Sequence, residues 1–180
     1  VPTILHKFNL QGGTQLVNRP VHTDTLYSLG TYEELTGTDD YEYQYAISCW
    51  VYLDSFPPNT TPAYNKYTSL LNFGGKPNIL YNASSNSFLI TMKQDGLDNK
   101  STAKLTDFDE DNNRILYKHD KVLLQKWNNI IINYNGGTMD IFLNGELVKS
   151  NIGVVPYYTL DKLTIGQENG INGGICNVTY

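Results

Sequence analysis

The sequence predicts an all-β protein built as a two-sheet antiparallel β-sandwich. Short runs of apolar and aromatic residues alternate with turn residues along the chain, and no helical period is sustained over a window of about 11 residues. We expect about ten to thirteen strands, and because one open sheet rarely holds more than ~10 strands, two packed sheets are expected. The length of 180 residues fits one domain.

Composition excludes several function classes. Hydrophobic residues make up 40% of the chain, which is enough for a core, and 14 of the aromatic residues are Tyr. The net charge is −5 and the 13 Lys and Arg residues form no run, so a nucleic-acid partner is not expected. No apolar run is long enough for a membrane span, and the first residues lack the pattern of a signal peptide.

The clearest pattern lies in residues 127–148, WNNIIINYNGGTMDIFLNGELV. Two strands rich in Ile and aromatic residues each end at an Asn-Gly pair, and a third short strand follows. Asn-Gly favours the type I′ turn, which needs positive φ at both central residues. Two such turns close together predict a β-meander.

Residues 43–53 predict a central strand. Tyr45, Ile47 and Cys49 alternate with Ala46 and Trp50, so both faces carry apolar side chains and both are expected to be covered. Further short strands are expected at residues 26–29, 67–73, 79–81, 88–92, 115–117, 122–124, 163–166 and 175–180.

Polar and proline-rich segments predict the connections. Residues 33–40 read as a solvated loop, and three prolines force a loop in residues 54–62. Residues 93–113 are polar and loop-like. Residues 1–20 are weakly patterned, and we expect an N-terminal arm or an edge strand there.

Cys49 and Cys176 are the two cysteines. Two cysteines in 180 residues do not make a disulfide scaffold, and neither stands in a metal-binding spacing. Because a free cysteine behaves as a small core hydrophobe, two buried thiols are expected.

The order of motifs resembles a known family. A strand with an interior Trp, AISCWVYL, is followed by a strand ending in FGG, then by WNNIIINY, an NGG turn and DIFLNGELV, and finally by LTIG and GGICNVTY. This order resembles the laminin G-like group of the concanavalin A-like lectin and glucanase superfamily over residues 43–180, and more weakly over residues 21–42. The form with WNNIIINYNGG and GGICNVTY is similar to domains of large DNA viruses.

The resemblance implies a jelly-roll domain over residues 21–180, with the arm before it. Such domains continue past the strand that matches residues 175–180, so the resemblance implies that the chain is truncated at its C-terminus. It also places the strand of Cys49 near the strand of Cys176, which leaves a disulfide between them as the alternative to free thiols.

Enzyme activity is not expected. Glucanases of this superfamily carry an E-x-D-x-x-E strand, because retaining hydrolysis needs two carboxyl groups close together. No Glu of this chain is followed two positions later by Asp, and no G-x-S-x-G or H-E-x-x-H motif occurs. We therefore predict a protein that is not an enzyme and that needs no cofactor.

Two kinds of binding site remain as candidates. Asp107, Asp109 and Asp111 alternate as in calcium-binding loops, although the Gly and Glu of an EF-hand loop are missing. The alternative is a solvated acidic loop. Glycans are bound by aromatic faces near loops, and the candidates for such contacts are Tyr64, Tyr67, Tyr81, Tyr157 and Tyr158. Packing on the sheets is the alternative for Tyr157, Tyr158 and Trp127.

These observations predict a non-enzymatic recognition or assembly module. The first hypothesis is a structural or surface protein of a large DNA virus, associated with the capsid and bound to other virion proteins. The alternative is a lectin-like module that binds glycans, and a degenerate glycoside hydrolase is the weakest alternative. The expected location is a virion or an extracellular surface. Functional residues are expected in the loops at 54–62 and 95–113 rather than in the meander.

Overall fold

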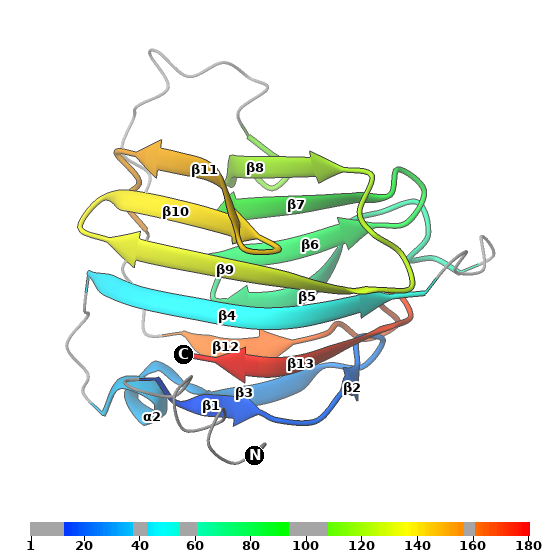
Figure 1. The fold of residues 1–180 in the computed structure, drawn as a ribbon, viewed down its shortest axis with the longest axis horizontal. Coiled ribbons are helices and arrows are strands. Elements are labelled where there is room, and N and C mark those ends of the chain that lie inside the picture. Colours follow the sequence, from blue (N-terminus) through cyan, green and yellow to red (C-terminus); the bar gives the residue numbers. More distant parts are fainter. Residues whose placement is uncertain (1–12, 38–42, 55–60, 94–107, 157–160) are drawn as a thin grey trace.

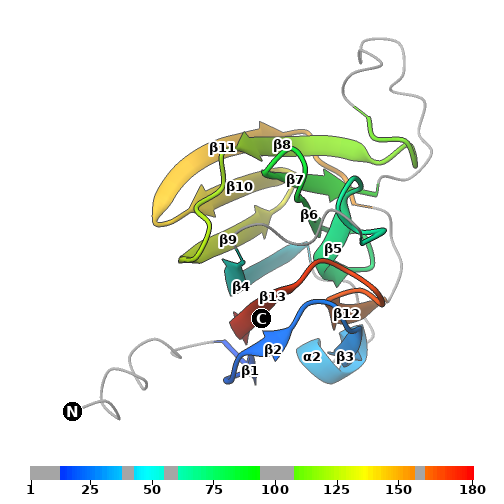
Figure 2. The same ribbon diagram turned by 90° about the vertical axis from the view of Figure 1, so that its right-hand side faces the viewer.

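The computed structural model describes residues 13–37, 43–54, 61–93, 108–156 and 161–180. Within these ranges the chain forms two antiparallel sheets packed face to face, as the sequence predicts (Figure 1). Figure 2, turned by 90°, shows the two sheets as separate layers. The expected two-sheet antiparallel β-sandwich is confirmed.

The front sheet lies nearer the viewer in Figure 1, in the order β1-β13-β4-β9-β10-β11, with β2 also paired to β13. Its strands are β1 (Gln15–Val17), β2 (Val21–His22), β4 (Gln44–Leu53), β9 (Trp127–Asn135), β10 (Thr138–Leu143), β11 (Glu146–Ile152) and β13 (Gly173–Thr179). The back sheet has the order β3-β12-β5-β6-β7-β8. Its strands are β3 (Tyr27–Thr31), β5 (Thr68–Phe73), β6 (Asn78–Asn82), β7 (Ser87–Met92), β8 (Arg114–Asp120) and β12 (Lys162–Ile165).

The predicted meander is β9, β10 and β11, joined by two tight turns. Asn144 and Gly145 have φ of 52° and 86°, so the second turn uses Asn-Gly as expected. In the first turn Gly136 and Gly137 carry the positive φ, at 50° and 98°. Asn135 instead ends β9, paired with Thr138. The first turn is thus one residue later than the Asn-Gly rule places it, because two adjacent glycines were available.

β4 is the centre of the front sheet, between β13 and β9. Every second residue from Tyr45 to Leu53 is buried in the core. The prediction that both faces of this strand are covered is wrong. Its other face looks away from the back sheet, and Trp50 there keeps 39% of its surface exposed. One covered face is the usual state of an antiparallel sheet.

Aromatic rings connect the two sheets at one end of the core. Tyr45 of the front sheet meets Phe73 of the back sheet edge-on, with 5.7 Å between ring centroids. The ring centroid of Tyr134 lies 5.3 Å from that of Tyr45. The Tyr45 hydroxyl donates to the buried backbone carbonyl of Lys76, so this polar group is satisfied within the core.

The polar segment predicted as a loop at residues 33–40 begins as the short helix α2 (Tyr32–Thr36). Thr31 and Glu34 form a capping box: the Thr31 hydroxyl accepts from the Glu34 N–H, and the Glu34 carboxylate accepts from the Thr31 N–H. Five residues are too few to show a helical period, which explains the error. The described residues contain no helix long and apolar enough to span a membrane.

Residues 122–124 were expected to form a strand and do not. Lys121 has a φ of 63° and ends the preceding strand, and its N–H donates to the Asn86 carbonyl. Val122 is nevertheless buried in the core. This segment is therefore apolar because a loop residue is buried in the core, and not because the segment forms a strand.

Cys49 and Cys176 are buried and free, so the structure corrects the disulfide alternative. Their strands are adjacent, as the resemblance implies, but Cys176 pairs with Trp50 and Cys49 pairs with Ile130. Because paired residues share a face and neighbours along a strand alternate, Cys176 lies on the outer face and Cys49 on the core face. The two thiols therefore sit on opposite sides of the sheet.

We predict an alkaline loss of stability that depends on Cys49. Burial, with a smaller contribution from Cys176, raises the pKa of the Cys49 thiol from 9.0 to about 12. Above pH 9 the unfolded chain loses this proton while the folded chain keeps it. The contribution of the protonated Cys49 thiol to the free energy of unfolding is therefore complete below pH 9. This contribution falls as the pH rises from 9 toward 12, by up to about 1.4 kcal/mol per pH unit.

Urea unfolding of wild type and Cys49→Ala between pH 8 and about 11 tests this. The variant is less stable at every pH because the substitution leaves a cavity. The comparison therefore uses the slope of the unfolding free energy against pH rather than its absolute value. A shallower slope in the variant is the expected result. Equal slopes above pH 9 would contradict the prediction.

Candidate functional site

A row of four residues crosses the outer face of the front sheet. The registers pair His22 of β2 with Gly174 of β13, Gly174 with Tyr52 of β4, and Tyr52 with Trp127 of β9. Residues paired in this way project to the same face of a sheet. The row therefore brings together four residues that are far apart in the sequence.

Gly174 leaves a hollow in the middle of this row. The place where its Cβ would stand is 3.7 Å from Trp127 Cη2, so the indole leans over the glycine. The rings of Tyr52 and Trp127 lie side by side with centroids 5.5 Å apart. Trp127 keeps 39% of its surface exposed, which leaves an aromatic face open to a ligand.

The hollow is part of a pocket of about 250 Å³. His22 and Asp54 lie on its lining beside the two aromatic rings. The lining residues are Pro20, Val21, His22, Tyr52, Asp54, Trp127, Gly173 and Gly174. An aromatic face flanked by hydrogen-bonding groups suits a ligand that has an apolar face and polar edges.

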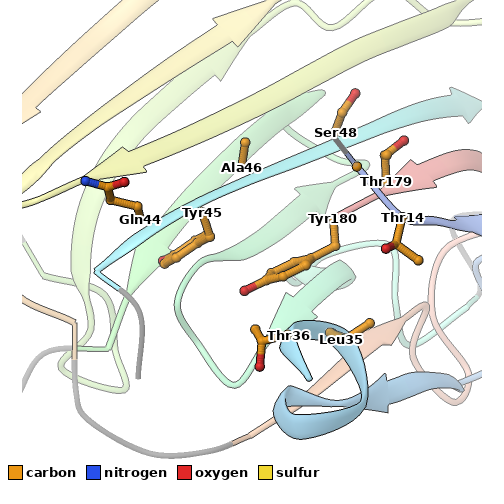
Figure 3. A pocket seen from close by; sticks show the side chains of 10 residues that line it. Thr14, Leu35, Thr36, Gln44, Tyr45, Ala46, Ser48, Thr179 and Tyr180 are labelled. Atoms are coloured by element: carbon orange, nitrogen blue, oxygen red, sulfur yellow. The ribbon is translucent and has the colours of Figure 1, made fainter. Parts of the chain in front are cut away.

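A second pocket of about 460 Å³ lies at the other end of β4. Figure 3 shows its side chains, which come from the start of β4, from α2, from the end of β13 with Tyr180 after it, and from Thr14 just before β1. The ring of Tyr180 is stacked on Tyr45, with an interplanar angle of 12°. The lining residues are Gly13, Thr14, Leu35, Thr36, Gln44, Tyr45, Ala46, Ser48, Thr179 and Tyr180. Hydroxyl and amide groups dominate its polar side chains.

Of the tyrosines chosen from the sequence, the three that the structure describes, Tyr64, Tyr67 and Tyr81, line neither pocket. Tyr67 shares a 2.9 Å hydrogen bond with Ser87, and the Tyr81 hydroxyl donates to Asn86. Burial, with a smaller effect of Tyr64, raises the pKa of Tyr81 to about 12. Tyr81 is thus a core residue, and its assignment as a glycan candidate is corrected. Tyr64 is half-buried and its backbone carbonyl accepts from Ser84.

Tyr157 and Tyr158 lie outside the described residues, and so does Asp107 of the predicted calcium loop. Asp109 organises its own turn: its carboxylate accepts from the backbone N–H groups of Asp111 and Asn113 at 3.0 and 2.7 Å. Asp111 is exposed. Within the part of the chain that the structure describes, no three His, Cys, Asp or Glu side chains group closely enough to hold a metal ion.

Sequence reasoning missed His22, Tyr52 and Gly174 as site residues, whereas Asp54 begins the loop of residues 54–62 in which functional residues were expected. The alternation of residues 43–53 already placed Trp50 and Tyr52 on one face, but their size favoured a covered surface. His22 and Gly174 carry no local signal, because only the strand register brings them beside Tyr52. Most residues of the two predicted loops, 55–60 and 94–107, lie outside the described residues, and the two pockets found in the described part are lined largely by residues of the front sheet.

Comparison with known proteins gives a family. A laminin G-type family model, described as the concanavalin A-like lectin/glucanases superfamily, matches residues 28–179. The match confirms the family predicted from the motifs. No curated protein sequence matches the chain.

Several solved structures superpose on this chain at low sequence identity. The binding domain of botulinum neurotoxin serotype D superposes with a TM-score of 0.59 at 11% identity, over 94% of this chain and 40% of that one. The binding domain of Paraclostridial Mosquitocidal Protein 1 superposes with a TM-score of 0.54 at 12% identity, over 94% of this chain and 42% of that one. Domain 4 of the arabinanase AbnA from Geobacillus stearothermophilus gives a TM-score of 0.49 at 12% identity, over 93% of this chain and 80% of that one. The chain therefore spans less than half the length of the two toxin structures.

Two adjacent glycines of β13 give a matched stability test of the hollow. A Cβ at residue 173 would stand 2.6 Å from the Tyr52 carbonyl oxygen, whereas one at residue 174 would meet nothing closer than 3.7 Å. Gly173→Ala is therefore expected to lower the free energy of unfolding by about 1–3 kcal/mol. Gly174→Ala is expected to change it by less than about 1 kcal/mol. Urea unfolding midpoints check this, and equal losses for both variants would contradict the geometry.

Proposed function

This chain belongs to the concanavalin A-like lectin/glucanase superfamily, and we propose that it is a non-enzymatic module that binds carbohydrate on the outer face of its front sheet. The observation that carries the proposal is the row His22, Gly174, Tyr52 and Trp127. Its exposed indole stands over a gap where a side chain is missing. A pyranose ring has the matching shape, since its apolar face stacks on an aromatic ring while its hydroxyls point outward.

Polar groups beside the rings complement those hydroxyls. Asp54 and His22 both line the pocket, and each offers a hydrogen-bonding side chain to a ligand stacked on Trp127. A carboxylate accepts only, whereas a neutral imidazole both donates and accepts. A few polar groups within a mainly apolar lining are typical of a small-molecule binding site.

The pocket linings support binding without hydrolysis. Canonical glycoside hydrolysis needs two carboxyl groups on either side of the scissile bond. Among the described residues that line the two pockets, Asp54 is the single acidic one. The degenerate glycoside hydrolase therefore stays the weakest of the three functions considered.

The toxin structures with the same fold are binding domains, which supports a recognition role for the fold. The chain's assignment to a large DNA virus, and its location on a virion or an extracellular surface, stay predictions from the sequence. A carbohydrate-binding domain on a virion surface would satisfy both of the leading hypotheses.

Assembly with other proteins has its own candidate surface at the edge strand β11. Ile152 there exposes 81% of its surface and Leu147 exposes 56%. The register with β10 shifts at a bulge between Ile141 and Phe142, and the exposed Lys149 pairs with Ile141 beside this bulge. Lysine and bulges on edge strands discourage the addition of another strand. We therefore place carbohydrate binding ahead of assembly.

The proposal predicts that Trp127→Ala weakens carbohydrate binding by about tenfold or more, because the variant removes the exposed stacking face. A glycan array of neutral and acidic glycans identifies bound glycans, and isothermal titration with the strongest neutral one measures the variant. Ile152→Ala is the matched control, since it removes an exposed apolar side chain from the same sheet away from the row. Absence of any binding on the array, or equal affinity of Trp127→Ala and wild type, would refute the proposal.

A further inference from the structure

The outer face of the three central strands of the front sheet carries no charged side chain. This surface, called here the neutral strip, consists of the outward residues of β4, β9 and β13. They are Gln44, Ala46, Ser48, Trp50 and Tyr52 on β4, Trp127, Asn129, Ile131, Asn133 and Asn135 on β9, and Gly174, Cys176 and Thr179 on β13. Over the whole chain 17% of residues are charged. A surface with polar amides, hydroxyls and aromatic rings but no charge is therefore a local feature.

Charges appear at the borders of the neutral strip. On β10 the next outward acidic side chain is Asp140, which pairs with Asn133 and accepts a 2.5 Å hydrogen bond from the Ser150 hydroxyl. At the other border Asp54 and His22 line the aromatic hollow. Because no Lys or Arg projects from the strip, an anionic ligand would lose hydration without gaining a counter-charge.

The two pockets open at opposite ends of the neutral strip. Tyr52 lines the aromatic hollow, Ser48 lines the hydroxyl-rich pocket, and Trp50 stands between them on the same face of β4. At about 3.4 Å per residue, the step from Gln44 to Tyr52 covers about 27 Å. That length is far more than one monosaccharide occupies, and exposed Trp50 provides an aromatic face between the two pockets.

We propose that the neutral strip binds a linear, uncharged polysaccharide chain along β4, and that several consecutive sugar rings contact the protein. This inference rests on the proposed carbohydrate-binding function and specifies its ligand class. One ring stacks in the hollow at Trp127 and Tyr52, and a following ring stacks on Trp50. The chain then continues over Ser48 into the pocket of Gln44, Ala46 and Thr179.

The far pocket suits sugar hydroxyls for a chemical reason. A hydroxyl both donates and accepts, and so do the Gln44 amide and the hydroxyls of Ser48 and Thr179. Ala46 has a small side chain, which leaves room above the strand between them. Asn133 and Asn135 on β9, which pair with Ala46 and Gln44, extend the amide surface beside this path.

Chain length is the decisive measurement. Isothermal titration of the whole protein uses glucose, mannose and xylose oligomers, each β-1,4-linked, as disaccharides and as hexasaccharides. Hexagalacturonate serves as the acidic probe. We expect at least one neutral hexasaccharide to bind about tenfold or more tighter than its own disaccharide, because added rings contact Trp50 and the far pocket. Hexagalacturonate is expected to bind more weakly than that neutral hexasaccharide.

A charge placed at the far end separates this inference from the proposed function. Ala46 is exposed, so Ala46→Glu is expected to fold normally. It should remove most of the gain from chain length, and an unchanged urea unfolding midpoint would show that the variant is folded. Ile152→Glu adds the same charge to the outer face of β11, away from the strip, and is expected to bind every oligomer as wild type does.

Each outcome decides one of the claims. Equal affinity for disaccharide and hexasaccharide, with no effect of Ala46→Glu, would overturn the extended chain but leave a single-ring site at Trp127. Tighter binding of hexagalacturonate would overturn the uncharged ligand class. Binding of none of these oligomers would overturn the inference, while a positive array result abolished by Trp127→Ala would still support the proposed function.

Discussion

The pairing of β4 with β9 and β13 is the constraint on which the rest of the structure depends. Its register with β9 runs unbroken from Gln44 and Asn135 to Tyr52 and Trp127. The two-residue period of a strand then divides β4 into a core face and an outer face. A slip of one residue would exchange the faces, which would expose Ile47 and Val51 and bury Trp50. Core packing therefore fixes the position of every outward side chain.

β13 meets this constraint with two local adjustments. Gly173 passes close to the Tyr52 carbonyl, where no side chain fits. Farther along, the register shifts between Cys176 and Thr179, and Asn177 takes a φ of 48°. The extra residue of this bulge turns Val178 into the core and returns Thr179 to the outer face beside Ser48. The same bulge thus completes the core and places a hydroxyl in the second pocket.

Much of this fold could be predicted from the sequence because its signals are local. The Asn144-Gly145 turn signal and the alternating pattern of residues 43–53 are each contained in a short stretch of sequence. The capping box of α2 is also local, but five residues show no period. The candidate site could not be predicted, since His22 and Gly174 become neighbours only through the pairing of β2 with β13. Trp50 and Tyr52 were visible, yet aromatic residues on a strand fit a covered face equally well.

A site on paired strands has a different energetic character from a site on loops. The ladder of β4 and β9 already holds Tyr52 and Trp127 in place, so a ligand pays little to order them. An open sheet face, however, surrounds any one ring on fewer sides than a deep cleft does, and each contact gains less from desolvation. A rigid, shallow and uncharged surface gains affinity most readily by adding contacts along its length. The register of β4 provides that length, because it repeats the same outward face from Gln44 to Tyr52.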